Sequence, residues 1–417
     1  MRLQRIMPAS IGYDSCVDVG FFNRYAETFT RTARIGWGKR FFCSMLLGVV
    51  MSTTASFSAA AGHIEIVREI HPEGGMSEPG TLAQTKEGGY VVAGVDHGVA
   101  VAMRIDADGK VQWRHNVDHR QLGARVSSYQ GVAVLPDDST VLCGFVEKVQ
   151  PFGVDGILTH VDRGGKILSQ RTMRPNFGDE PAKVSYLDGC LTWGEGVLLI
   201  GHALRISVND PAHPRNEMFA WLMALDVKAE IKWEKLLPGL GGATVEVLHM
   251  PNQDLVAQLG GGPIFRVGSD GALKSKNLVP GWMIRQWQGR PVVAVLFPPD
   301  EHSVTLRTLG EQLDVVKTVT GTAAPISPKA ATYALADGSL AVFGFQRGGV
   351  TKAAVSWIGA DMNNHEKLVF DSYGDSIWVS DAVPTGNSGE FAAIRPVIKE
   401  RSGSFDLGMV LSFVRFK

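Results

Sequence analysis

The sequence predicts an all-β fold built from one repeated unit. Short apolar runs follow turn signals at intervals of about fifty residues, as where Tyr90–Gly94 follows Gly88-Gly89 and Leu340–Gly344 follows Asp337-Gly338. The runs are rich in β-branched residues, which favour strands, and the turn signals hold Gly and Asp, which favour turns. About seven such units, each with room for four strands, fill the chain. A fixed period of four short strands is typical of a β-propeller, so we expect seven four-stranded antiparallel blades.

The first sixty residues predict an export signal ahead of this fold. Lys39-Arg40 precedes the apolar run Phe41–Met51, and small residues then lead to Ala59–Ala61, which is the order of regions in a secretory signal peptide. A membrane anchor is the alternative, but this run has about eleven residues and a spanning helix needs roughly twenty. We expect an extension and signal peptide over residues 1–61 and one propeller domain over 62–417, periplasmic or secreted from a bacterium, without a membrane span.

The segment Ile64–Ile70 predicts a strand that stands ahead of the first unit. It alternates apolar and polar residues as an outer strand does. The last unit ends at Lys417 after its third strand and therefore lacks a fourth. We expect Ile64–Ile70 to pair with Leu407–Arg415, complete the last blade and close the ring, because this placement covers both unpaired edges.

The unit is clearest from residue 88 to residue 117. Tyr90–Ala93 and Val99–Asp106 predict two buried strands, and an Asp-Gly hairpin signal then leads into Lys110–Val117. Successive side chains of Lys110–Val117 point to opposite faces of the strand, and one of these faces is polar. This pattern predicts an outer strand with one solvent-exposed face. Trp113 of this strand recurs as Trp233 in a later unit. These tryptophans could form a recognition surface, but we expect them to cover the edge of their own sheet.

Two family resemblances rest on this unit. The GGYVVAG strand, followed by a hairpin with Asp106, Gly109 and Trp113, resembles the β-propeller repeat of many exported bacterial proteins, which implies the fold and the compartment. The hairpin is also similar, one residue short, to the D-x-x-x-G-x-x-x-W motif of quinoprotein alcohol dehydrogenases, and Asp226 with Trp233 repeats it. The second resemblance implies pyrroloquinoline quinone. Only these two units keep the tryptophan, and about seven blades are expected rather than eight, so no cofactor is predicted.

Composition excludes several classes of function. Beyond residue 61 the chain has 34 Lys and Arg against 39 Asp and Glu, whereas a nucleic-acid-binding protein presents a basic surface. No G-x-S-x-G nucleophile motif, H-E-x-x-H zinc motif or phosphate-binding loop occurs. We expect a monomer that binds no nucleic acid, and whether it catalyses a reaction stays open.

Cys143 and Cys190 are the cysteines that remain beyond the leader. In an oxidising compartment a disulfide between them is possible. The repeat places them on neighbouring sheets, however, and stacked sheets lie about 10 Å apart, which is farther than a disulfide usually spans. We expect two buried thiols and keep the disulfide as the alternative.

The loops between the second and third strands, and between successive units, emerge at one end of the sheets and predict the binding site. His and Asp residues there could hold a metal ion if three or more converged, or they could be separate solvated side chains. No metal ligands are assigned, because no H-x-x-H spacing occurs. The candidate ligand-binding residues are His71, Asp96, His97, His119, Arg120, Asp210, His213, Arg215, Asp300, His302 and Arg347.

One of these loops points to recognition. The stretch Arg205–Glu217 holds two prolines around Ala212-His213, which predicts a stiff, exposed loop longer than a hairpin needs. We therefore expect a module that binds a protein or glycan through its loop face and performs no chemistry. The alternative is a periplasmic metal- or quinone-dependent enzyme with its site in the central funnel.

Overall fold

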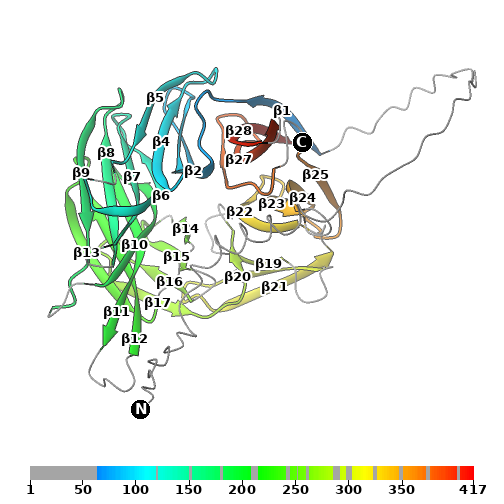
Figure 1. Cartoon of the computed structure of the whole chain (residues 1–417). Helices are drawn as coiled ribbons and strands as arrows, with labels where there is room; N and C mark the ends of the chain where they lie inside the picture. The colour runs from blue at the N-terminus through cyan, green and yellow to red at the C-terminus, as the bar shows by residue number, and fades with distance from the viewer. Residues whose placement is uncertain are drawn as a thin grey trace, which may run out of the picture. The chain divides into compact units, whose positions relative to one another are not determined.

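The regular elements that the structure describes are all strands (Figure 1). The computed structural model describes residues 63–417 except 119–120, 150–152, 179–181, 208–214, 241–244, 251, 260–262, 285–291, 297–302, 323–325, 347–350, 372–375 and 402–403. The predicted signal peptide and the domain boundary at residue 61 lie outside these residues. Within them, no helix is long and apolar enough to span a membrane. The prediction of an all-β fold is confirmed.

The strands form consecutive groups of four, which we number from the first to the seventh. The first group is β2 (Glu78–Gln84), β3 (Tyr90–Asp96), β4 (Val99–Ile105) and β5 (Val111–Asn116); the second is β6 (Ala124–Val134), β7 (Thr140–Lys148), β8 (Gly153–Val161) and β9 (Ile167–Met173); the third is β10 (Val184–Trp193), β11 (Gly196–Ser207), β12 (Arg215–Leu225) and β13 (Ile231–Pro238). The fourth group is β14 (Val245–His249), β15 (Leu255–Leu259), β16 (Ile264–Val267) and β17 (Leu273–Asn277); the fifth is β18 (Trp282–Met283), β19 (Val292–Leu296), β20 (Ser303–Leu309) and β21 (Val315–Thr322). The sixth group is β22 (Ile326–Ala334), β23 (Leu340–Gln346), β24 (Lys352–Ile358) and β25 (His365–Val369); the seventh is β26 (Asp381–Pro384), β27 (Glu390–Arg401) and β28 (Ser404–Phe416) with β1 (Ile64–Ile70).

Strands pair antiparallel within every group. Five of the groups are separate four-stranded sheets, and the second and third groups join into one eight-stranded sheet. The join is a single parallel bridge between Val154 of β8 and Val184 of β10. We call the first strand of each group its inner strand.

In the first three groups, an aspartate caps the turn between the third and fourth strands. Asp106 accepts hydrogen bonds from the backbone N–H groups of Asp108 at 3.0 Å and Lys110 at 2.9 Å, and Gly109 has a φ of 91°. In the third group Asp226 accepts the equivalent bonds, and Ala229 adopts a φ of 62° in the glycine position. The aspartate therefore holds the turn even where glycine, which adopts positive φ without strain, is missing.

The seventh group is completed by the N-terminal strand. β1 pairs antiparallel with β28, from Ile64 opposite Phe416 to Ile70 opposite Leu411. This pairing confirms the predicted partner of Ile64–Ile70. The buried Arg395 on β27 donates to Glu69 of β1 at 2.7 Å, so an ion pair as well as the strand ladder holds β1 in register.

The apolar core lies between neighbouring groups. In the described residues there are seven clusters of buried side chains; six each join two successive groups, and one joins the seventh group with the first. In that last cluster Tyr90 of β3 meets Phe413 of β28 with ring centroids 5.7 Å apart. Apolar runs such as Tyr90–Ala93 are buried without alternation, because the groups on either side cover both faces of the sheet.

Candidate functional site

The structure describes the side chains of only three predicted ligand-binding residues, His71, Asp96 and His97. Arg215 is the first residue of β12, and its side chain lies outside the described part. The other predicted residues also lie outside the described residues: His119, Arg120, Asp210, His213, Asp300, His302 and Arg347. His71 is half-buried in the connection from β1 to β2.

Asp96 and His97 come together at the tight turn between β3 and β4. His97 is 82% exposed, and its Nδ1 lies 2.9 Å from Asp96 Oδ1. Arg114 of β5, which the sequence did not single out, pairs with the other Asp96 oxygen at 2.5 Å. Partial burial opposes ionisation of Asp96, but the hydrogen bonds from Arg114 and His97 prevail and lower its pKa. The turn therefore presents an ionised carboxylate that is already paired.

These side chains do not build a metal site. Among the described residues, no three His, Cys, Asp or Glu side chains lie close enough to hold one ion. The imidazole of His97 has its Asp96 contact and otherwise faces solvent.

Two hairpins extend beyond the others at this end of the sheets. β11 and β12 are paired over eleven residue pairs, ending at Ser207 opposite Arg215, and β27 and β28 over twelve. The equivalent hairpin of the first group has seven pairs. At about 3.3 Å per residue, four more pairs lengthen a hairpin by about 13 Å. Figure 1 shows β11 and β12 as a long hairpin. The stretch Arg205–Glu217 was predicted as a loop throughout, but its two ends continue the strands.

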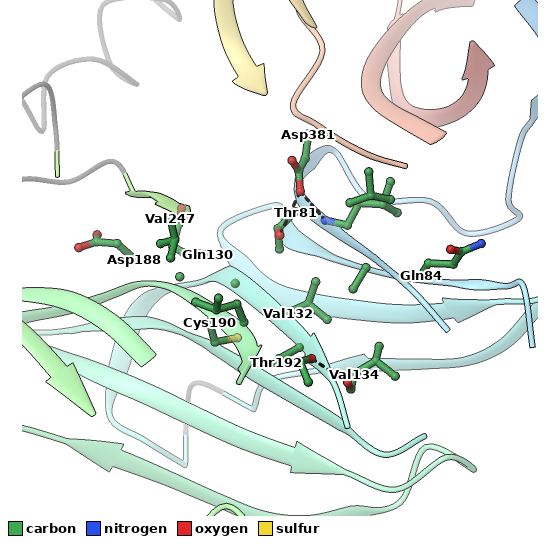
Figure 2. A pocket seen from close by; sticks show the side chains of 17 residues that line it. Thr81, Gln84, Gln130, Val132, Val134, Asp188, Cys190, Thr192, Val247 and Asp381 are labelled. Atoms are coloured by element: carbon green, nitrogen blue, oxygen red, sulfur yellow. Dashed lines mark hydrogen bonds between the residues drawn. The ribbon is translucent and has the colours of Figure 1, made fainter. Parts of the chain in front are cut away.

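A cavity of about 400 Å³ lies among the inner strands (Figure 2). Residues of β2, β6, β10, β14 and β26 line it, and most come from the halves of these strands that lead into the turn to the next strand. Its polar lining includes Thr81, Gln130, Asp188, Thr192 and Asp381. The described candidates His71, Asp96 and His97 lie toward the opposite end of the sheets, so sequence analysis missed this cavity.

Asp381 connects two inner strands across the cavity wall. Its carboxylate accepts the backbone N–H of Leu82 at 3.0 Å and the hydroxyl of Thr81 at 3.4 Å, both from β2 (Figure 2). Asp381 itself is on β26 and is 8% exposed. This side chain therefore links the seventh group to the first, and a polar residue inside an expected inner strand is the signal that could have revealed it.

Asp188 and His202 form the second polar pair at the cavity. Asp188 Oδ2 lies 2.6 Å from His202 Nδ1, and each side chain is 6% exposed. Tyr186 stacks on the His202 ring with centroids 4.8 Å apart. Burial raises the pKa of Asp188, although His202 acts in the opposite direction. Among the described residues, no third His, Cys, Asp or Glu joins this pair in a group that could hold a metal ion.

The tryptophans connect neighbouring groups instead of forming a recognition surface. Trp113 donates its indole N–H to the carbonyl of Arg163 in the β8–β9 turn at 3.2 Å, and Trp233 donates likewise to Ser269 at 3.1 Å. A Cβ at Gly165 would lie 2.7 Å from Trp113, so glycine makes room for the ring. The expectation that each tryptophan covers only its own sheet is thus corrected: the ring also covers the hairpin of the next group.

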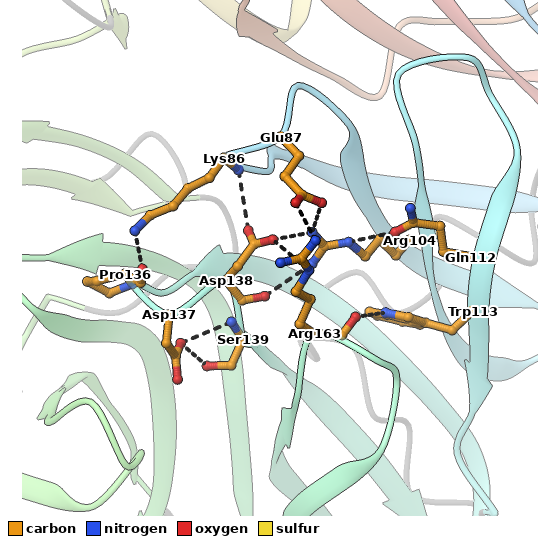
Figure 3. A network of polar contacts seen from close by, with 10 residues as sticks. All are labelled: Lys86, Glu87, Arg104, Gln112, Trp113, Pro136, Asp137, Asp138, Ser139 and Arg163. Atoms are coloured by element: carbon orange, nitrogen blue, oxygen red, sulfur yellow. Dashed lines mark hydrogen bonds and ion pairs between the residues drawn. The ribbon is translucent and has the colours of Figure 1, made fainter.

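A network of charges reinforces the same junction (Figure 3). Arg104 of β4 is 1% exposed and pairs with Asp138 in the β6–β7 turn. Glu87, from the β2–β3 turn, lies 3.8 Å from Arg104 and also pairs with Arg163. The charges of these side chains neutralise one another between the first two groups. This arrangement is typical of a structural link and not of a ligand site.

Comparison with known proteins supports the fold. No protein-family model matches the chain, and no curated protein sequence matches it. The chain is similar to virginiamycin B lyase from Staphylococcus aureus, with a TM-score of 0.52 and 10% sequence identity over 85% of this chain and 100% of the lyase. BamB from Moraxella catarrhalis matches 85% of this chain and 98% of its own, at 12% identity and a TM-score of 0.39. The likeness to the lyase shows a β-propeller-type fold.

Proposed function

We propose that the chain is an exported, seven-bladed β-propeller closed by β1, and that it is a binding module. The cycle of seven core clusters supports the blade number, because one cluster joins the seventh group with the first. The pairing of β1 with β28 supports the closure. Export is supported by the order of charged, apolar and small residues before residue 62.

The two extended hairpins carry the binding proposal. β11–β12 and β27–β28 have four or five more residue pairs than the hairpin of the first group. Folding does not need this additional length, since the shorter hairpins also pack against their neighbours. We infer that the hairpin ends and the turn at Asp96 and His97 contact a protein or glycan partner. A protein is favoured, because projecting strand edges offer backbone groups for strand addition.

A capture experiment tests this function. The immobilised full chain is exposed to native envelope extract, beside a variant in which residues 206–216 are replaced by a short Gly-Ser turn and a second in which residues 399–406 are shortened. We expect at least one of these variants to lose a partner that the unchanged chain retains. The control replaces the Asp361–Asn364 turn at the opposite end and should retain it. Equal capture by all proteins would contradict the proposal, and loss after periodate treatment of the extract would identify a glycan.

The alternative of a metal- or quinone-dependent enzyme has less support. The two carboxylates of the cavity are engaged by protein groups, and the tryptophan motif serves to join neighbouring groups. Elemental analysis and an absorption spectrum of the protein isolated from its native envelope test the alternative. A stoichiometric metal or a quinone band would restore it.

A further inference from the structure

The two cysteines that the sequence placed on separate sheets meet in the structure. Cys143 of β7 is 0% exposed and Cys190 of β10 is 9% exposed, and both belong to the core cluster between the second and third groups. The Cys190 thiol donates a hydrogen bond at 3.5 Å to the carbonyl of Val141, two residues before Cys143 on β7. The expectation that neighbouring sheets would hold them about 10 Å apart is therefore wrong at this position.

Gly131 explains the close approach. It lies opposite Cys143 in the β6–β7 ladder. A Cβ at Gly131 would lie 2.7 Å from Cys143 Sγ and 2.3 Å from the backbone N of Cys190, so these two atoms are within about 5 Å of each other. Because residue 131 has no side chain, β10 approaches β6 directly and Cys143 fills the remaining space.

We propose that Cys143 and Cys190 are a disulfide-forming pair that locks the second group to the third. Apart from hydrophobic packing and side-chain contacts, these groups are joined by one bridge in the strand ladder, between Val154 and Val184. A disulfide needs two cysteines whose backbones lie within a few ångströms of each other. The hydrogen bond from Cys190 Sγ to Val141 and the close approach at Gly131 place Cys143 and Cys190 at such a range. We infer the disulfide from this geometry, and it does not depend on the proposed binding function.

The cavity gives an oxidant access to one of the two thiols. Cys190 is part of the cavity wall (Figure 2). Cys143 is not part of the cavity lining and is 0% exposed. The Cys190 thiol loses its proton and attacks one sulfur of a small disulfide oxidant. That sulfur stays bound to Cys190 as a mixed disulfide, and the other sulfur leaves and takes up a proton to become a thiol. The Cys143 thiol then loses its proton and attacks the Cys190 sulfur, and the second thiol leaves. Two cysteine thiols are oxidised and one disulfide is reduced to two thiols.

The reaction should be slow in the folded protein. Burial and the contact with Cys190 raise the pKa of the Cys143 thiol, and the thiolate is the reactive form. Formation during folding in an oxidising compartment avoids this barrier. Once formed, the bond encloses residues 143–190 in a loop and restricts the unfolded chain, so it should raise Tm.

The test refolds the full chain from denaturant in a buffer of oxidised and reduced glutathione. We expect mass spectrometry of the unreduced digest to show the Cys143 peptide joined to the Cys190 peptide, and calorimetry to show a Tm several degrees above that of the reduced protein. In C143S and C190S the Tm difference between oxidised and reduced samples should disappear. Free thiols at both positions after refolding, or mixed disulfides with glutathione alone, would overturn the proposal.

A glycine substitution tests the geometry itself. Gly131→Ala pushes β10 away from Cys143, so the cross-linked fraction at a fixed glutathione ratio should fall severalfold. Gly408→Ala is the matched control, because a Cβ there meets only Val397 Cγ2 at an ordinary 3.7 Å. Equal cross-linking in G131A, G408A and the unchanged chain would show that the close approach at Gly131 is not what brings the thiols together.

Discussion

Buried ionic side chains are the residues on which the packing of neighbouring groups depends most sharply. Arg104 and Arg395 are almost completely buried, and each has a carboxylate partner from another element: Asp138 in the β6–β7 turn and Glu69 on β1. A buried charge without its partner costs far more than a surface charge, because it has lost its hydration. Single substitutions at these pairs should therefore have large effects.

Replacing Asp138 by Asn tests the first pair. Asn, like Asp, tolerates the φ of 66° at this turn, but the substitution removes the charge opposite Arg104. We expect the free energy of unfolding, measured in urea, to fall by about 3 kcal/mol, the lower end of the usual range, because Glu87 remains nearby. Glu147→Gln is the control, since its partner Arg125 is 65% exposed, and it should cost less than about 1 kcal/mol. Similar effects of both substitutions would contradict the argument.

The raised pKa of Asp188 predicts a pH dependence of stability. Its ordinary pKa is 3.8, and burial in the folded chain raises it. As pH rises above 3.8 the unfolded chain releases this proton while the folded chain still holds it, so the free energy of unfolding falls until pH passes the raised pKa. Relative to Asp188→Asn, the unchanged protein should become less stable as pH rises above about 4. A rising difference over that range would show that His202 stabilises the ionised form instead.

At the scale of elements, turn chemistry predicted the strands well and hairpin length poorly. The Asp-Gly turn after β4 forms where expected, and β5 has its alternating wet face. The ends of the Arg205–Glu217 stretch are strands, because pairing across the hairpin satisfies their backbone groups despite the prolines between them. Local sequence shows where a turn begins, but cross-strand pairing decides how far a hairpin extends.

A reciprocal pair of turn substitutions tests this element-level account. Gln253 is exposed with a φ of 64°, in the same turn position that Gly88 occupies with a φ of 80°. Gln253→Gly should raise the free energy of unfolding by about 0.5–1 kcal/mol, because it relieves a strained backbone. Gly88→Gln should lower it by about 1 kcal/mol or more for the converse reason. Thermal unfolding of both variants provides the measurement, and changes of the same sign would contradict the account.

For the whole molecule, the fold was more predictable than the site. The repeat and the unpaired first and last strands predicted the all-β architecture and the partner of β1. Both could be predicted because the repeat period and the number of strands in each unit can be counted in the sequence. The cavity was missed, because Thr81, Asp188 and Asp381 lie more than a hundred residues apart and meet only when inner strands assemble. The contact of Cys143 with Cys190 was missed for the same reason: it depends on a missing side chain at Gly131 on a third strand.

Deleting residues 62–70 tests the role of β1 in the whole molecule. The deletion exposes the hydrogen-bonding edge of β28, removes the partner of buried Arg395 and uncovers apolar side chains such as Ile64. We expect a loss of several kcal/mol against a typical total of about 5–15 kcal/mol, seen as aggregation or a much lower Tm. Val67→Ser is the control, since Val67 is 41% exposed, and it should leave Tm nearly unchanged. A truncated protein that melts with the unchanged chain would refute the proposed closure.

The pairing of β1 with β28 also determines when the molecule can finish folding. Glu65 and its partner Arg415 are separated by 350 residues, so the pair joins the first and last strands that the structure describes. At about 5–20 residues per second, a ribosome makes Arg415 roughly 20–70 seconds after Glu65. During that interval the first strand has no partner, and the apolar side chains that later meet β28 are open to other chains. We therefore expect β1 and the apolar side chains near it to need protection during synthesis until Arg415 has been made.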